Sequence, residues 1–358
     1  NLKYKDCDIA NFGRLTLSLL KMICRKCNSP GTLIIRKEYC FCVDCFNINI
    51  NHKFRACIGK NKIISANDKI LICLSGDSNS TVLLDLIHTS ISLNNHKKLR
   101  ILPNFLHVVE NIKDSVLEQC KKYNFDVEIV HMEEYIKNNN IFNPNNTSIK
   151  HSDCSINMNN LPATIKYDVK KKLKQSIFLE IAKKLQCKII FTAETTSILA
   201  TRLLSNLAIG RGSQVENDIG FIDNRDGCVK ILRPMKDISN EEIEHYIKIN
   251  KLNPPNIKHE KENSLQLVIQ TFVLDLQENY PATISTICKT ADKMSSHDNL
   301  KNQKKCTACQ FLRFWKGFFL EIQYVHIFKF RGRYKLNHYM GGSTKIGQLL
   351  EVICLNHI

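Results

Sequence analysis

A short apolar run that ends at a polar turn leaves few folds open to this chain. Residues 69–75 read Lys-Ile-Leu-Ile-Cys-Leu-Ser, and residues 81–87 read Thr-Val-Leu-Leu-Asp-Leu-Ile. The first run has the length of a buried strand and the second has the length of a helix, so together they predict a strand, a loop and a helix. Further buried strands are expected at 100–109 and 126–132, strands at 187–193 and 229–232, and helices at 113–123, 169–185 and 196–207. This alternation predicts a parallel sheet in an α/β fold.

The C-terminal part of this pattern carries clear helix signals. Ser239 followed by Glu242 is a capping box, so a helix is expected to start at Asn240 and run to about residue 249, before Pro254 and Pro255. A helical region is expected at 264–294. A segment rich in asparagine, at about 137–161, interrupts the alternation and predicts a flexible insertion.

The loop between the first strand and helix reads Ser-Gly-Asp-Ser-Asn-Ser. Backbone N–H groups and hydroxyls at a helix N-terminus favour an anion such as phosphate, which makes Ser75, Gly76, Ser78 and Ser80 candidate nucleotide-binding residues. The loop lacks the Gly-Lys-Ser/Thr ending of a Walker loop. The alternative is a plain strand-to-helix turn.

Two C-x-x-C pairs, Cys24 with Cys27 and Cys42 with Cys45, are separated by fourteen residues. Four thiolates at this spacing can surround Zn²⁺ tetrahedrally, and they leave no open position for catalysis, so a structural zinc site is expected. Cys40 can replace Cys42 but ranks lower, because it breaks the two-residue spacing. The alternative is a reduced module whose cysteines bind no metal.

The formal net charge of +17 predicts attraction to a polyanion, either RNA or a membrane surface. The alternative is a solvated basic surface. After the second cysteine pair, His52, Lys53, Phe54 and Arg55 place cations around an aromatic ring, so they can pair with phosphates and stack on a base. A solvated connector is the alternative for these four residues.

Neither a secretory signal nor an apolar window of about 18 residues is found, so we expect an intracellular protein with no membrane association. Sixteen cysteines in such a protein indicate metal ligands and buried thiols rather than disulfides. Residues 1–21 show no pattern, and the chain opens with Asn1, so either the start is missing or Met22 is the true start. Residues 311–358 begin with eight aromatics that follow no period, and we expect this atypical tail not to be native.

Several motifs together resemble a known family. The strand with its S-G-x-x-x-S loop is similar to the PP-loop of the ATP-pyrophosphatase superfamily, whose usual form is S-G-G-x-D-S. Over residues 22 to about 310, the order of motifs resembles the cytoplasmic tRNA 2-thiolation protein 2 family. These motifs are the two cysteine pairs, His52-Lys-Phe-Arg-Ala56, Gly59-Lys60, the loop at Ser75, Asn206-Leu-Ala-x-Gly-Arg-Gly212, Asp218-x-Gly-Phe221 and Leu232-Arg-Pro-Met-x-Asp237.

The resemblance implies a Rossmann-like PP-loop sheet, of the adenine nucleotide alpha hydrolase type, behind an N-terminal zinc-ribbon-like module. It implies a cytoplasmic subunit that helps to place sulfur on the wobble uridine (mcm5s2U) of lysine, glutamate and glutamine tRNAs. Its partners would be a catalytic paralogue, tRNA and a thiocarboxylated ubiquitin-related modifier as sulfur donor. We expect a zinc module at 22–60, a degenerate PP-loop domain at 61–262 and a helical region at 263–310. Cys306 and Cys309 in that region form a candidate second metal site, completed by ligands from elsewhere in the fold or from the partner.

The loop departs from the working PP-loop pattern at two positions. Asp77 replaces the second glycine and Asn79 replaces the aspartate, and a carboxylate at position 77 would repel phosphate and weaken ATP binding. The paired core cysteines of catalytic paralogues are also missing, since Cys154 is alone and Cys73, Cys120, Cys187 and Cys228 lie in or beside apolar runs. We therefore assign no catalytic residue. The alternatives are an active ATP-dependent tRNA sulfurtransferase and an unrelated zinc-module RNA-binding protein.

Overall fold

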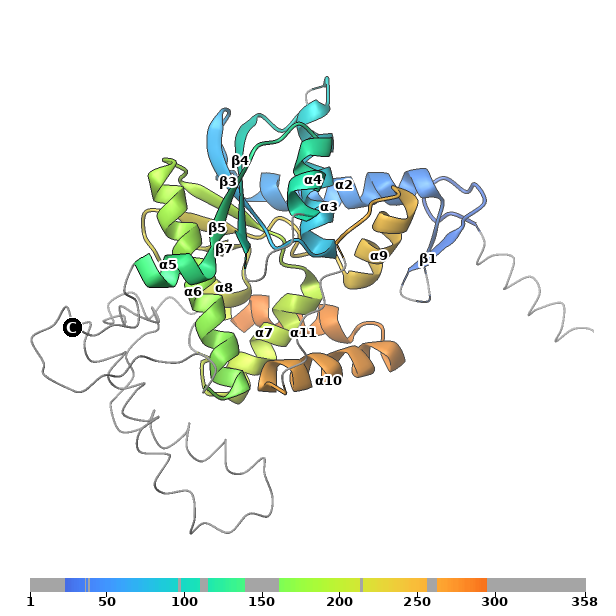
Figure 1. Cartoon of the computed structure of the whole chain (residues 1–358). Coiled ribbons are helices and arrows are strands. Elements are labelled where there is room, and N and C mark those ends of the chain that lie inside the picture. Colours follow the sequence, from blue (N-terminus) through green and yellow to red (C-terminus); the bar gives the residue numbers. More distant parts are fainter. Residues whose placement is uncertain are drawn as a thin grey trace, which may run out of the picture.

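A six-stranded sheet lies at the centre of the molecule (Figure 1). This computed structural model describes residues 23–294 apart from 36, 38, 96–97, 110–114, 139–160, 213–214 and 256–262. The strand order is β5-β4-β3-β6-β8-β7, and every pairing is parallel except that of β7 with β8. The strands are β3 (Asp68–Leu74), β4 (Ile101–Val109), β5 (Val127–His131), β6 (Ile189–Thr192), β7 (Ile222–Asp223) and β8 (Lys230–Leu232). The predicted α/β fold is therefore confirmed.

Helices cover both faces of this sheet (Figure 1). One face packs against α2 (Val43–Lys60), α3 (Ser78–Ser92), α4 (Ser115–Lys122) and α9 (Asn240–Ile249), and the other packs against α5 (Met132–Asn138) and α6 (Ala163–Lys184). Side chains of β3 alternate between the two faces: Ile70 and Ile72 join the first cluster, whereas Leu71 and Cys73 join the second. Both faces of β3 are thus buried, as its continuous apolar run predicts.

The capping box predicted for the last of these helices is present. Ser239 accepts the backbone N–H of Glu242, and the Glu242 carboxylate accepts the backbone N–H of Ser239. The helix spans Asn240–Ile249, as expected from these two residues.

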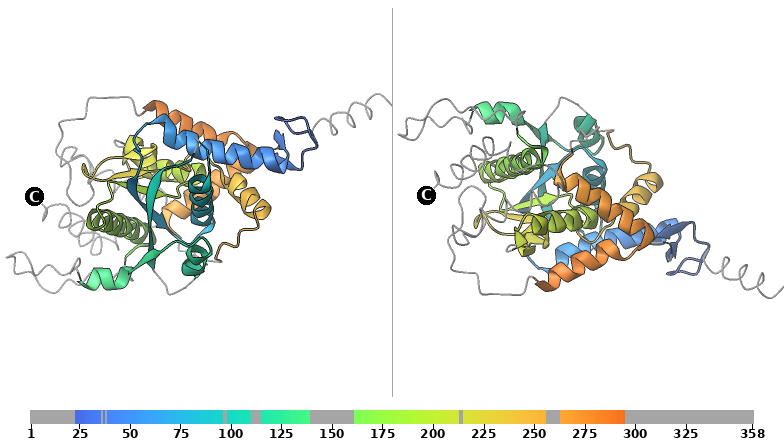
Figure 2. Two further views of the ribbon diagram at one scale, coloured as in Figure 1. Left: turned by 90° about the horizontal axis from the view of Figure 1, so that it is seen from above. Right: turned by 90° about the horizontal axis from the view of Figure 1, so that it is seen from below.

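The N-terminal module is a two-stranded hairpin joined to a long helix. Strands β1 (Leu33–Ile35) and β2 (Tyr39–Phe41) pair in antiparallel fashion, and α2 follows them directly. The hairpin lies at one end of the molecule, at the N-terminal end of α2 (Figure 2). Phe46, Ile50 and Phe54 of α2 lie in the same buried cluster as β3 and α3, so the module shares its core with the sheet. No helix was predicted at 43–60, within the expected zinc module.

The helical region expected at 264–294 consists of two helices. Helix α10 (Leu265–Asn279) ends before Tyr280 and Pro281, and α11 (Thr283–Met294) follows. The proline cannot continue α10, which explains the break. Both helices pack against α7 (Thr196–Ala208), and α11 also contacts α8 (Val215–Ile219), so these four helices form a separate group (Figures 1 and 2).

Two details of burial differ from the sequence-based expectations. β5 was expected to be a buried strand, but as the edge strand of the sheet it has only half-buried and exposed side chains. Cys228 was expected to be a buried thiol, but it lies exposed in the turn before β8. Four predictions fall outside the described residues. They concern most of the insertion expected at about 137–161, Cys154, the pair of Cys306 and Cys309, and the tail at 311–358. No helix of the described part is both long enough and apolar enough to cross a membrane.

Candidate metal centre and nucleotide loop

Cys24, Cys27, Cys42 and Cys45 come together in one group, with their sulfur atoms all within 4.8 Å of one another. The Sγ atoms of Cys27 and Cys42 are 3.6 Å apart. Four sulfurs around a tetrahedral Zn²⁺ lie about 3.8 Å apart, because each Zn–S bond is about 2.3 Å long. The donor set and its size therefore fit a metal such as zinc.

The second cysteine pair lies at the N-terminus of α2. Cys42 is the N-cap residue, and its sulfur accepts the backbone N–H of Cys45 at 3.5 Å. The partial positive charge of a helix N-terminus stabilises thiolates, which are the form that binds metal. Cys40 is buried in β2 opposite Ile34 and is not part of the group.

The four thiols differ in how readily they lose a proton. Burial opposes ionisation of Cys24, but backbone N–H groups of Cys42, Lys26 and Cys27 outweigh it and lower the pKa of Cys24 to about 6. The hydroxyl and backbone of Ser29 lower the pKa of Cys27, whereas the neighbouring Cys27 and Cys42 sulfurs raise the pKa of Cys45. Several thiols crowded together resist full ionisation, and a bound cation relieves that repulsion.

The loop after β3 is closed by its own hydrogen bonds. Asp77 is the N-cap of α3, and its carboxylate accepts the backbone N–H of Ser80 at 2.8 Å. The Ser80 hydroxyl accepts the backbone N–H of Gly76 at 2.9 Å and donates to the Asp77 carbonyl at 3.0 Å. Gly76 has a φ of 82°, a conformation that favours glycine. Of the candidate nucleotide-binding residues, Ser75 and Ser78 are exposed, while Gly76 and Ser80 are buried.

This arrangement differs from the expectation for Asp77. We expected its carboxylate to face the phosphates, whereas it occupies the helix N-terminus itself and supplies the negative charge there. The N–H groups of Gly76 and Ser80 are also already bonded within the loop. The Asp77 carboxylate disfavours phosphate binding by repulsion. The two bonded N–H groups disfavour it because they are no longer free to donate to a phosphate.

The buried thiols of the sheet and of α4 are unsuited to nucleophilic chemistry. Burial raises the pKa of Cys73 well above its ordinary value, raises that of Cys120 to about 11, and also raises that of Cys187. Each of these thiols is therefore protonated at neutral pH and unreactive. Within the described ranges, cysteines gather only in the four-sulfur group at the N-terminal module.

A network of charged side chains, not predicted from the sequence, lies where β6 and β8 end. Cys73 of β3 lies beside Thr192 of β6, so the loops that follow these parallel strands meet at one edge of the sheet. There the Glu194 carboxylate forms ion pairs with Arg202 of α7 and with Arg233, which follows β8. Arg233 also donates to the Gly220 carbonyl at 2.7 Å. The Leu232-Arg-Pro motif pointed to this position, but not to its partner.

Further charged side chains lie near Glu194 and its two arginines. Arg225 contacts the Asp218 carboxylate at 2.9 Å and the Asp223 carboxylate at 2.5 Å. Arg202 and Arg233 together outweigh the cost of burial and lower the pKa of Glu194. Burial and the neighbouring Arg202 lower the pKa of Lys171 on α6 to about 7. These charged side chains are thus paired with one another within the chain, beyond the ends of β6 and β8.

The structure does not hold His52, Lys53, Phe54 and Arg55 as one basic-aromatic cluster. All four lie on α2, but Phe54 is fully buried in the core, so its ring cannot stack on a base. The Lys53 ammonium binds both oxygens of the Glu242 carboxylate, at 2.6 and 2.8 Å. His52 is exposed and Arg55 is half-buried. Consecutive residues of a helix point in different directions, which separates these side chains.

The sheet is parallel except for β7, and its central strand β3 leads into a Ser-Gly loop, which is the arrangement of a PP-loop α/β fold. The fold is similar to that of the U34-tRNA thiolase NcsA from Methanococcus maripaludis, solved with its 4Fe–4S cluster, with a TM-score of 0.63 and 17% identity over 88% of this chain and 98% of that one. At this identity the likeness concerns the fold alone.

Sequence comparisons give the family. The model of a family described as cytoplasmic tRNA 2-thiolation protein 2 matches residues 264–314. Proteins of that name from Drosophila simulans and Drosophila melanogaster are each 30% identical to this chain, over 309 and 312 residues, which is 80% of this chain and 76% of each relative. The chain belongs to the cytoplasmic tRNA 2-thiolation protein 2 family.

Proposed function

We propose that this chain is the non-catalytic partner in a cytoplasmic complex that thiolates the wobble uridine of tRNA. The family is named for tRNA 2-thiolation, and the fold is shared with a U34-tRNA thiolase. In this proposal the chain binds tRNA and forms a heterodimer with a catalytic PP-loop paralogue. That paralogue takes sulfur from a thiocarboxylated ubiquitin-related modifier and acts on the lysine, glutamate and glutamine tRNAs.

The closed loop is the observation that carries the non-catalytic assignment. Activation of a uracil oxygen needs ATP, whose phosphates would have to bind the N–H groups of the loop. The Asp77 carboxylate already accepts the Ser80 N–H and adds a negative charge there, and the Ser80 hydroxyl accepts the Gly76 N–H. A reactive thiolate would also have to meet the base, and Cys73, Cys120 and Cys187 are buried thiols with raised pKa values.

The four-cysteine group is proposed to hold a structural Zn²⁺. Cys24, Cys27, Cys42 and Cys45 would supply all four ligands, so the metal would stabilise the hairpin and the start of α2 without taking part in the reaction. Positive charge on the rest of the chain supports binding to the tRNA backbone, since the net charge is +17.

The proposal is tested by substituting the two exposed serines of the loop, Ser75→Ala together with Ser78→Ala. The variant is combined with the wild-type catalytic partner and tRNA, and 2-thiouridine per tRNA is measured by mass spectrometry of nucleosides. We expect wild-type levels of modification. Ser92→Ala, an exposed serine at the other end of α3, is the matched control.

A loss of thiolation in the double variant would contradict the proposal. Hydroxyls that bind phosphate oxygens in a transition state contribute several kcal/mol, so their loss from a working site lowers the rate by orders of magnitude. If thiolation collapses in the double variant while size-exclusion chromatography still shows the heterodimer, the loop is an active site. The chain would then be an ATP-dependent tRNA sulfurtransferase in its own right.

A further inference from the structure

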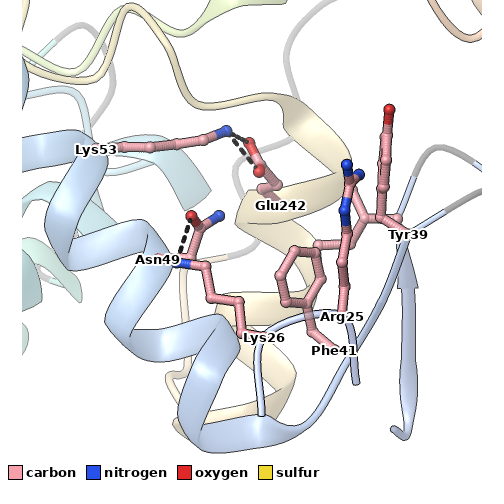
Figure 3. A pocket seen from close by; sticks show the side chains of 8 residues that line it. Arg25, Lys26, Tyr39, Phe41, Asn49, Lys53 and Glu242 are labelled. Atoms are coloured by element: carbon pink, nitrogen blue, oxygen red, sulfur yellow. Dashed lines mark hydrogen bonds and ion pairs between the residues drawn. The ribbon is translucent and has the colours of Figure 1, made fainter. Parts of the chain in front are cut away.

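A hollow of about 350 Å³ lies between the N-terminal module and α9, outside both the metal group and the loop (Figure 3). Arg25 and Lys26 enter it from the turn between the first two cysteines, Tyr39 and Phe41 from β2, and Asn49 from α2. Its volume is at the lower end of the range for ligand pockets and suits a group the size of one nucleoside.

One wall of the hollow is a stack of a cation on an aromatic ring. The Arg25 guanidinium lies over the Tyr39 ring, 4.4 Å from its centroid (Figure 3). The backbone N–H of Arg25 donates to the Cys40 carbonyl at 3.0 Å, which ties the turn to β2 and places the guanidinium beside the ring. A guanidinium that lies over a ring can present its other face as a stacking surface for a planar group.

The remaining charges decide where an anion can sit. Lys53 is neutralised, because its ammonium binds both oxygens of Glu242 and also the Asp237 carbonyl. The Lys26 ammonium makes a longer contact, 3.4 Å, with the Asn49 amide oxygen. Since an ammonium has three N–H donors, Lys26 can also contact a phosphate at the rim. Arg25 and Lys26 therefore give the hollow a positive rim next to a flat stacking wall.

We propose that this hollow binds one unpaired nucleotide of the RNA, with its base stacked on the Arg25 guanidinium and its phosphate beside Lys26. The inference rests on the proposed function, because it takes the polyanion to be tRNA. Single-stranded RNA is recognised by stacking of splayed bases on aromatic rings and on guanidinium planes, which matches the combination of Arg25 and Tyr39. The Asn49 amide, with one donor group and one acceptor group, faces the same space and can contact a base edge (Figure 3).

An acidic peptide is the competing occupant, and Arg25→Lys separates the two. This substitution keeps the positive charge but removes the planar surface, so a carboxylate would still bind while a base would lose its stacking partner. Tyr39→Leu removes the ring that supports the guanidinium. Arg100→Lys, an exposed arginine outside the hollow, is the matched control. Zinc content, measured on every purified full-length variant, shows whether the nearby cysteine group is intact.

Binding is measured by fluorescence anisotropy with three probes: tRNA, a stem-loop RNA with an unpaired loop, and a blunt RNA duplex of the same length. We expect Arg25→Lys and Tyr39→Leu to weaken stem-loop binding by about 5- to 100-fold, the range for loss of one stacked base, without changing duplex binding. Lys26→Ala should lower the slope of log affinity against log salt by about 1 for the stem-loop RNA and leave the slope for the duplex unchanged.

The outcomes separate this inference from the function on which it rests. If the wild type binds tRNA and Arg25→Lys binds the stem-loop as tightly as the wild type does, the nucleotide pocket is wrong while tRNA binding stands. If Arg25→Lys and Tyr39→Leu weaken duplex and stem-loop binding equally, the hollow does not read unpaired bases, and the inference is overturned. If the wild type binds none of the three RNAs, the proposed role in tRNA binding fails together with the pocket.

Discussion

The carboxylate of Asp77 accepts the backbone N–H of Ser80, so the loop after β3 caps its own helix. Replacement of an Asp N-cap by Ala costs about 1 kcal/mol of stability. We expect Asp77→Ala to lower the free energy of unfolding by about this amount, measured by urea denaturation. Asp77→Asn retains a capping oxygen and should cost less. Equal stability of Asp77→Ala and the wild type would mean that the cap contributes nothing.

Loss of the first cysteine pair should remove one metal ion. Cys24→Ser with Cys27→Ser leaves only two thiolates, which do not close a tetrahedral zinc site. Metal analysis of the purified full chain should show about one zinc fewer per molecule than in the wild type. Cys40→Ser is the control, because Cys40 lies outside the group, and it should keep the zinc. An unchanged zinc content in the double variant would reject the assignment.

Binding of tRNA should depend steeply on salt. With a net charge of +17, the chain is expected to bind mainly through phosphates, and such binding releases counterions. Between about 50 and 200 mM salt the affinity should fall by orders of magnitude, as judged by filter binding or anisotropy. Affinity that does not change over this range would show that the excess positive charge has no role in RNA binding.

The lysine in the ion network should make stability depend on pH. Burial and the neighbouring Arg202 lower the pKa of Lys171 to about 7 in the folded chain, whereas an unfolded lysine titrates near 10.4. Between these values the unfolded chain binds one more proton, so the free energy of unfolding rises with pH by up to about 1.4 kcal/mol per pH unit. Lys171→Met should lack this rise between about pH 7 and 8.5, where the thiols titrate equally in both proteins.

The control for that experiment is the exposed Lys188. Lys188→Met should keep the wild-type dependence on pH, because Lys188 is exposed and lies before β6, whereas the ion network lies beyond the other end of that strand. A wild-type slope in the Lys171→Met variant would show that Lys171 remains charged in the folded chain.

Glu194, which lies between two arginines, is expected to be important for stability. Glu194→Gln removes the negative charge that Arg202 and Arg233 share, and an uncompensated buried charge is costly. We expect a loss of about 3 to 5 kcal/mol in the free energy of unfolding, measured in urea. Lys236, whose ammonium pairs with the half-exposed Asp292, offers the surface comparison: Asp292→Asn should cost less than about 1 kcal/mol.

Local patterns were sufficient to predict much of this molecule. The apolar run of β3, the capping box of α9 and the spacing of the four cysteines each depend on residues close together in sequence, and the structure places all three as the patterns indicate. The two halves of the cysteine group could be paired because a tetrahedral metal needs four ligands. No tertiary information was needed for these features.

Helix α2 was missed because its helical character comes from burial. Its apolar residues Phe46, Ile50 and Phe54 recur every four positions, which is a helical spacing, but asparagines and β-branched isoleucines between them have poor helix propensity. Contact with the core overrides that propensity. The ion network could not be predicted from the sequence for a different reason. Glu194 and Arg233 are 39 positions apart, and only the fold of the sheet brings them together.

Helix α2 also fixes the geometry of the whole N-terminal module. With 18 residues, no proline and no glycine before Gly59, it is a rigid strut about 27 Å long, at 1.5 Å per residue. One end carries the cysteine group, and the other end leads to β3, where it is anchored in the core. The length of α2 therefore sets the distance between the sheet and any RNA segment that contacts the cysteine module.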